Sequence, residues 1–87
     1  MTYERILVDR YNINNLYMQR NHDHNADEQW EIRMYSEDIT LLRFCSIKEC
    51  IDTFNKILVE AYTMNKKFIF NIFPKKNNKY TIKEVLI

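Results

Sequence analysis

The segment FCSIKECIDTF, residues 44–54, marks where the chain is expected to pass from strand to helix. Ser46 is placed to cap the first turn of a helix, and Glu49, three residues later, completes a capping-box pattern. Cys45 and Cys50 then occupy the two positions of a hydrophobic staple across that turn. Because free cysteine behaves as a small hydrophobic residue, we interpret both thiols as structural rather than as a redox pair or a zinc site. A local regulatory disulfide stays open as an alternative.

Apolar residues recur at three- and four-residue steps after Ser46, which predicts one amphipathic helix. The stripe consists of Ile47, Cys50, Ile51, Phe54, Ile57, Leu58, Ala61 and Tyr62. The chain contains no glycine, so positions that need a positive φ fall to asparagine, the next most tolerant residue. The candidates for turns and helix ends are Asn14, Asn15, Asn65, Asn77 and Asn78. Among them, Asn65 is the expected residue just after the helix.

The other apolar runs predict strands, because their side chains alternate or are apolar on both faces. The predicted strands are residues 3–8, 16–20, 29–35, 39–45, 67–73 and 80–87. A short helix is the alternative in the N-terminal third. We therefore expect a single domain over residues 1–87, with an α+β fold in the order β-β-β-β-α-β-β. One amphipathic helix would pack across one face of an antiparallel-rich sheet of four to six strands.

A single helix covers one face of such a sheet, so the opposite face is expected to meet solvent or a partner. Its candidate residues mix charge with large apolar groups: Glu31, Arg33, Tyr35, Leu41, Arg43, Ile69 and Phe73. This mixture is typical of binding surfaces.

Composition narrows the class of protein. The chain has 87 residues, 46% of them hydrophobic and 14% aromatic, which suits one small packed domain. No apolar run approaches the roughly 20 residues that span a bilayer, and the N-terminal residues are charged, so we expect a cytoplasmic protein with no membrane association. The many Ile, Asn and Lys residues are encoded by A/T-rich codons, which favours an origin in a low-GC bacterium, a phage or a plasmid.

The sequence offers few parts for catalysis. It has no glycine-rich phosphate loop and none of the common hydrolase or metalloprotease motifs. His22 and His24 could bind a metal with Asp27 or Glu28, but a polar hairpin loop explains the same residues and is the favoured interpretation. We expect no catalytic residues, no metal site and no cofactor.

The two halves of the chain carry opposite charge. Residues 1–44 hold five arginines and eight acids, a net charge of −3, whereas residues 45–87 hold eight lysines and four acids, a net charge of +4. The predicted partner-binding surface is the acidic set together with an arginine and a tyrosine: Asp23, Asp27, Glu28, Glu31, Arg33, Tyr35, Glu37 and Asp38. Carboxylates held on a rigid sheet can imitate a phosphate track and occupy a basic groove.

The basic C-terminal hairpin is the alternative site. Its lysines and tyrosine would bind nucleic acid: Lys66, Lys67, Lys75, Lys76, Lys79, Lys83 and Tyr80. The phenylalanines interleaved with them are Phe68, Phe70 and Phe73. Lysines with exposed aromatic rings can hold phosphates and stack bases, although phenylalanine in a strand is more often part of the core.

The order of a W-E-I-R strand, a short turn, a further strand and a helix opened by Ser46 resembles the three-stranded DNA-reading domains of phage-integrase arms and plant ethylene-response factors. The resemblance covers residues 16–62. It implies that arginines along the sheet would read the major groove, and only Arg20, Arg33 and Arg43 are placed for that role. We do not assign the chain to either family.

Taken together, these features favour a small non-catalytic protein of phage or mobile-element type. It would inhibit or modulate a host protein or protein–nucleic acid complex by surface binding. A nucleic-acid-binding module is the second hypothesis and an enzyme the third. Homodimerisation is left open.

Overall fold

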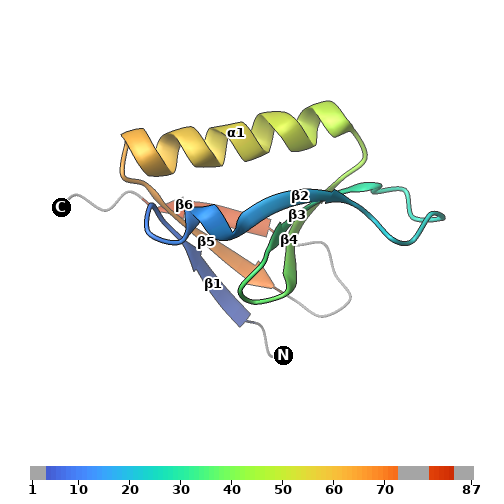
Figure 1. The fold of residues 1–87 in the computed structure, drawn as a ribbon, viewed down its shortest axis with the longest axis horizontal. Helices are drawn as coiled ribbons and strands as arrows, with labels where there is room; N and C mark the ends of the chain where they lie inside the picture. Colours follow the sequence, from blue (N-terminus) through green and yellow to red (C-terminus); the bar gives the residue numbers. More distant parts are fainter. Residues whose placement is uncertain (1–3, 73–78, 84–87) are drawn as a thin grey trace.

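The computed structural model describes residues 4–72 and 79–83. The element order β-β-β-β-α-β-β confirms the predicted α+β fold, including strands rather than a helix on either side of residues 12–15. The strands are all antiparallel to their neighbours but are divided between two three-stranded sheets. Figure 1 shows the long helix lying along one side of the molecule, with both sheets beneath it.

The first sheet combines the first strand of the chain with its last two strands. Its order is β1 (Glu4–Val8), β5 (Lys67–Ile72) and β6 (Lys79–Lys83), with β5 in the centre. Val8 pairs with Phe68, and both side chains are fully buried, as is Phe70. The dense run of Phe and Ile in β5 is therefore explained by its central place in this sheet.

A tight turn of polar side chains carries the chain from β1 to the second sheet. The Asn12 side chain accepts a hydrogen bond from the Asp9 N–H at 2.8 Å and donates one to the Leu7 carbonyl at 2.7 Å. A short 3₁₀ helix, η1 (Ile13–Asn15), follows and buries Ile13. Asn14 and Asn15 belong to η1. They therefore do not adopt the positive φ expected of them.

The second sheet has the order β2 (Leu16–Arg20), β3 (Trp30–Met34) and β4 (Ile39–Phe44). Its two hairpins are continuous in sequence. The register shifts between β3 and β4, because Ile32 pairs with Leu42 whereas Arg33 pairs with Thr40.

The register shift makes Leu41 the extra residue of a β-bulge. The bulge interrupts the alternation of side chains along β4, and Leu41 is fully buried. The expectation that Leu41 belongs to an outer face was therefore wrong, since simple alternation cannot anticipate a bulge.

The helix α1 (Ile47–Thr63) begins and ends where the sequence predicts. The Ser46 hydroxyl accepts a hydrogen bond from the Glu49 N–H at 3.4 Å, which confirms the N-cap. At the other end Asn65 has a φ of 52°, and the Lys66 N–H donates to the Glu60 carbonyl at 3.2 Å. This is the left-handed closure expected at a helix C-terminus.

The two thiols of the first turn differ in environment. Cys50 is buried, but Cys45 is exposed, and both are free cysteines. The predicted staple is therefore wrong for Cys45, because only one of its two members packs inside. Cys50 instead lies against β3, where its Sγ is 3.8 Å from the Glu31 carbonyl oxygen.

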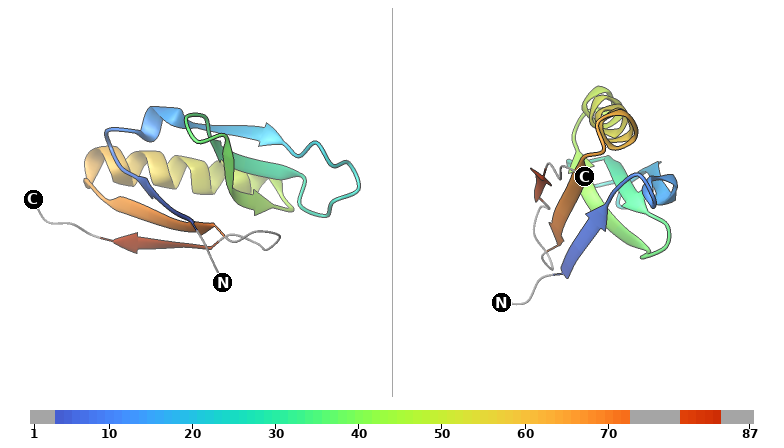
Figure 2. Two further views of the ribbon diagram at one scale, coloured as in Figure 1. Left: turned by 90° about the horizontal axis from the view of Figure 1, so that it is seen from below. Right: turned by 90° about the vertical axis from the view of Figure 1, so that its left-hand side faces the viewer.

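The core lies between α1 and the two sheets, which spread apart below the helix in the right-hand view of Figure 2. From the helix it takes the buried residues Cys50, Ile57 and Ala61. The strands and η1 contribute Val8, Ile13, Leu16, Ile32, Met34, Leu41, Leu42, Phe68 and Phe70. The side of each sheet away from this core carries no helix of the described residues.

Candidate binding surface

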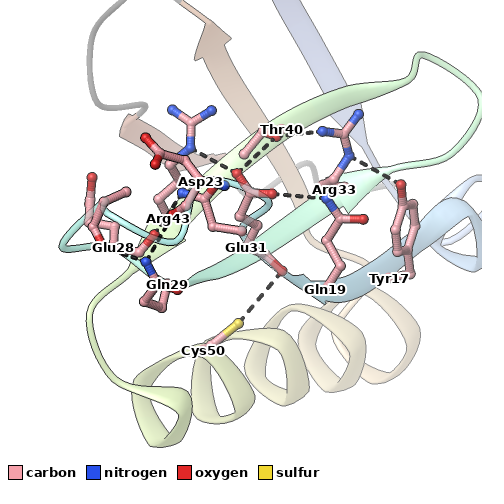
Figure 3. A network of polar contacts seen from close by, with 12 residues as sticks. Tyr17, Gln19, Asp23, Glu28, Gln29, Glu31, Arg33, Thr40, Arg43 and Cys50 are labelled. Carbon is pink, nitrogen blue, oxygen red and sulfur yellow. Dashed lines mark hydrogen bonds and ion pairs between the residues drawn. The ribbon is translucent and has the colours of Figure 1, made fainter.

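The side of the β2-β3-β4 sheet away from α1 carries a continuous layer of polar side chains, which we call the polar face. Strand register creates it, because residues directly opposite each other on neighbouring strands point to the same side. Gln19 pairs with Glu31, which pairs with Arg43, and in the next row Tyr17 pairs with Arg33, which pairs with Thr40. Figure 3 shows these six side chains directed away from the helix.

Glu31 is the centre of the polar face and is only 3% exposed. Its Oε1 accepts a hydrogen bond from Gln19 Nε2 at 2.9 Å, and its Oε2 accepts one from Arg43 Nε, also at 2.9 Å. Burial alone would raise the pKa of Glu31, but hydrogen bonds from Gln19 and Arg43, with the charges of Arg43 and Arg33, lower it overall. The carboxylate therefore stays ionised and organises the strands on either side of it.

Arg33 is the central hydrogen-bond donor of the second row of the polar face. Its Nε donates to the Tyr17 hydroxyl at 3.1 Å, its Nη1 to Thr40 Oγ1 at 2.9 Å and its Nη2 to Asp38 Oδ1 at 2.8 Å. Asp38 has a φ of 50°, so the β3–β4 turn adopts a left-handed residue while presenting this carboxylate to Arg33. A guanidinium with three separate partners is held in one orientation.

The polar face is tied to the helix on its other side through β3. Cys50 Sγ lies 3.8 Å from the Glu31 carbonyl oxygen, as the dashed line in Figure 3 marks. Burial raises the pKa of the Cys50 thiol, so this sulfur remains protonated and can donate to that oxygen. Glu31 is thus held on one side of the sheet through its carboxylate and on the other through its carbonyl oxygen.

Between β2 and β3, residues 21–29 form a loop that projects from one end of the molecule (Figure 1); we call it the tip loop. Its own side chains fix its shape. Asn21 Oδ1 accepts from the Asp23 N–H at 3.0 Å, and Asn21 Nδ2 donates to the Glu28 carbonyl at 2.9 Å. Gln29 Nε2 donates to the carbonyls of Asp23 and Ala26. Such internal bonds reduce the entropy that a loop would lose on binding.

The tip loop and the polar face meet at a surface depression of about 400 Å³. The depression is lined by Asn21, Asp23, Ala26, Asp27, Glu28 and Arg43. Three of these side chains are acidic, and the arginine is already paired with Glu31 at 2.9 Å. The depression therefore has an excess of negative charge and suits a cationic group on a partner.

Tyr35, in the β3–β4 turn, is the most prominent ring beside the polar face. It is 77% exposed, and its ring packs edge-to-face on Tyr17, with centroids 6.3 Å apart. Tyrosine anchors of this kind are common in protein interfaces, since the ring loses little entropy on binding.

The acidic residues predicted from sequence divide into two groups. Asp23, Asp27 and Glu28 come together at the tip loop, whereas the carboxylates of Glu31 and Asp38 are neutralised by Arg43 and Arg33. Glu37 is exposed in the β3–β4 turn. The expectation that Glu31 meets solvent or a partner was therefore wrong, because its neighbours on β2 and β4 cover it.

Sequence reasoning missed the partners that organise the polar face, namely Tyr17, Gln19 and Thr40. A signal was present, because Tyr17 and Gln19 alternate with apolar residues in β2 just as Glu31 and Arg33 do in β3. It could be used only once the register between the two strands was known.

The basic set is less suited to stacking bases than the sequence indicated. Phe68 and Phe70 are fully buried, so they belong to the core. Lys66 Nζ lies 2.8 Å from Glu60 Oε1, and both side chains are mostly buried. Lys67 is half-buried and pairs in register with Lys83.

The remaining members of the basic set are only partly covered by the described residues. Lys79 pairs in register with Asn71. Phe73, Lys75, Lys76 and the asparagines at 77 and 78 lie outside the described residues, and so does the side chain of Tyr80.

The arginines implied by the resemblance to DNA-reading domains are engaged within the chain itself. Arg33 and Arg43 pair with carboxylates, and the guanidinium of Arg20 lies 5.9 Å from the centre of the Trp30 ring. His22 and His24 are exposed in the tip loop. Within residues 4–72 and 79–83, no group of three or more His, Cys, Asp or Glu side chains is placed to hold a metal ion.

Comparison with protein-family models, with curated proteins and with solved structures found no match to this chain in any of the three. In the part of the chain that the structure describes, α1 is not long and apolar enough to cross a membrane.

Proposed function

We propose that this protein is a cytoplasmic, non-catalytic binding protein that inhibits or modulates a host protein or protein–nucleic acid complex. Its binding surface would be the tip loop, the adjoining polar face and Tyr35. The observation that carries the proposal is the acidic depression, lined by Asp23, Asp27 and Glu28, at the end of a sheet in which Glu31 is paired with Arg43 and Asp38 with Arg33.

The pairing of the inner charges supports this choice of site. Glu31 and Arg33 are fixed by hydrogen bonds within the sheet, so a partner need not compensate their charge. The acids of the tip loop remain available for long-range attraction to a basic surface, which raises association rates. The internal hydrogen bonds of the loop support binding without a large ordering cost.

The partner that fits this chemistry is a protein with a basic groove, of the kind that binds nucleic acid. A rigid loop with three carboxylates could occupy such a groove in place of phosphates. The origin in a phage or mobile element is part of the proposal and is supported by the A/T-rich codon usage that the composition implies.

The test is affinity capture from lysates of low-GC bacteria, with the retained proteins identified by mass spectrometry. The wild-type protein should retain a protein with a basic surface, and retention should weaken as salt is raised past about 0.5 M. Asp27→Lys combined with Glu28→Lys should abolish retention, since it reverses two charges beside the depression without removing a hydrogen bond that shapes the tip loop.

The matched control reverses two acids of the helix, Glu49→Lys with Asp52→Lys, which should leave retention unchanged. Circular dichroism should show that both double variants fold. If the wild type retains only background proteins, or if the two double variants lose the same partner equally, the proposed surface is wrong.

A further inference from the structure

Strand β2 has an outer edge that no other described strand pairs with, and this edge differs from the other sheet edges. Within the described residues, β1, β2, β4 and β6 lie at sheet edges. Natural edges are protected by charged residues or by bulges, which prevent pairing with another strand. β1 begins with Glu4 and Arg5, and β6 carries Lys79 and Lys83. β4 contains the bulge.

β2 lacks these protections, because its sequence is LYMQR and its single charge is at the last residue. It contains neither proline nor bulge, and its register with β3 is continuous. Its central residue, Met18, is 40% exposed on the same side of the sheet as the helix. An unprotected edge strand with an exposed apolar residue at its centre can pair with another strand.

The hydrogen-bond pattern shows which backbone groups of β2 face outward. The Tyr35 N–H donates to the Asn15 carbonyl, and the Asn21 N–H donates to the Gln29 carbonyl. In an antiparallel pair hydrogen-bonded residues alternate, so the groups between these positions that point toward β3 belong to Tyr17 and Gln19. The N–H and C=O of Met18 therefore point toward the free edge.

Leu16 and Arg20, the residues two positions before and after Met18, differ in the backbone groups that they present to the free edge. The Leu16 N–H already donates to the Ile13 carbonyl inside η1, so at Leu16 only the carbonyl faces the edge. Arg20, two residues after Met18, keeps both its N–H and its C=O on that side by the same alternation. A strand that pairs here in antiparallel fashion therefore needs a donor opposite Leu16.

The helix adds an apolar flank above this edge. Tyr62 donates from its hydroxyl to Asn14 Oδ1 at 2.7 Å, which places that side of α1 over the segment leading into β2. The same side of the helix carries Ile47 and Ile51. Tyr62 and Ile47 are each 48% exposed, and Ile51 is 37% exposed. A partner strand beside β2 would lie next to them.

We infer that the occupant of this edge is a second copy of the chain, paired β2 to β2 in antiparallel orientation about Met18. In that register Met18 faces its own copy, and the two exchange N–H···O bonds because both groups point outward. Arg20 lies opposite Leu16 of the second copy, so its N–H donates to the one Leu16 group that needs a donor. The two arginines do not face each other, so no like charges oppose across the pair.

The resulting dimer has two-fold symmetry, the commonest closed arrangement of soluble oligomers. It joins two three-stranded sheets into one continuous sheet and extends the polar face across both copies. Met18 becomes buried against Met18 of the second copy, between the apolar flanks of the two helices. This inference rests on the β2 edge and is independent of the tip loop.

Sedimentation equilibrium tests the inference on wild-type protein from about 1 µM to about 1 mM. The expected result is a monomer–dimer equilibrium within this range. Met18→Lys places two ammonium groups opposite each other at the symmetry axis and should raise the dimer Kd about tenfold or more. Met18→Pro removes the outward N–H while leaving the β3 ladder intact, because proline is tolerated on an edge strand, and it should also abolish the dimer.

The matched control is Leu7→Lys, since Leu7 is 42% exposed on β1, an edge of the other sheet. It should leave the dimer Kd unchanged, and circular dichroism should show that each variant folds. A wild type that stays monomeric at the highest concentration overturns the inference. So does a dimer that Met18→Lys leaves intact, or that Leu7→Lys weakens as much as Met18→Lys does.

Discussion

Glu31 shows how a single residue can decide the character of a surface. The alternation of strand β3 predicts that it points away from the helix, and it does, but it is buried among Gln19, Arg43 and Thr40. A buried carboxylate is tolerated here because donors on both neighbouring strands satisfy its two oxygens. The residue is therefore a scaffold for the polar face rather than a displayed acid.

Substituting Glu31→Gln should lower the free energy of unfolding by about 1–3 kcal/mol, because it leaves Arg43 and Gln19 without an anionic acceptor. Chemical denaturation with urea measures this directly. The exposed Glu37→Gln in the β3–β4 turn is the control and should change stability by no more than about 0.5 kcal/mol. Equal effects of the two substitutions would show that the buried network contributes nothing.

The same carboxylate predicts how stability depends on pH. The pKa of Glu31 is lowered in the folded protein, so its contribution to stability is fully present above the ordinary value of 4.5 and is lost as pH falls through the lowered one. Denaturation of wild type and Glu31→Gln between about pH 7 and pH 2 should therefore give a stability difference that shrinks on acidification. A difference that grows toward low pH would contradict the assigned direction.

At the level of elements, local signals were sufficient for the helix and for the existence of each strand. Ser46 and Asn65 mark the ends of α1 through side-chain and backbone chemistry within a few residues. The division into two sheets and the bulge at Leu41 depend on which strands pair. Pairing is decided by contacts between distant parts of the chain, so it could not be predicted from local patterns.

The same limit applied to the candidate site. The sequence predicted the acids of the tip loop, because a polar stretch between two strands is a loop wherever the strands pair. It did not predict that Glu31 and Asp38 would be neutralised, because Arg43 and Arg33 reach them only in the observed register.

The N-cap offers a prediction at this scale. Ser46→Ala should destabilise α1 and lower the free energy of unfolding by about 1 kcal/mol, since the Glu49 N–H loses its acceptor. Thermal unfolding followed by circular dichroism provides the measurement. Ser36→Ala, in the exposed β3–β4 turn, is the matched control and should have little effect; a loss as large as that of Ser46→Ala would contradict the capping role.

The C-terminus of α1 offers a second prediction at the scale of elements. Asn65 has a φ of 52°, a region that glycine enters without the steric cost of a Cβ atom. Asn65→Gly should therefore preserve or slightly raise stability, whereas Asn65→Val should lower it by about 1 kcal/mol or more. The pair of thermal midpoints tests this, and a valine variant as stable as the glycine variant would rule out the left-handed closure.

At the scale of the whole molecule, the two candidate binding sites belong to different sheets. The acids of the tip loop lie at the far end of the β2-β3-β4 sheet, while Lys67 and Lys83 belong to the β1-β5-β6 sheet. The proposed function assigns partner binding to the acidic end, and the alternative assigns nucleic-acid binding to the lysines. The two can be separated because their residues do not overlap.

The most direct measurement is a titration of ¹⁵N-labelled protein with the partner obtained by affinity capture, followed through amide chemical shifts. If the partner binds at the tip loop, the shifts should concentrate in residues 21–29 and on the polar face, with Tyr35 among the largest. Shifts confined to strands β5 and β6, or spread along α1, would contradict this account.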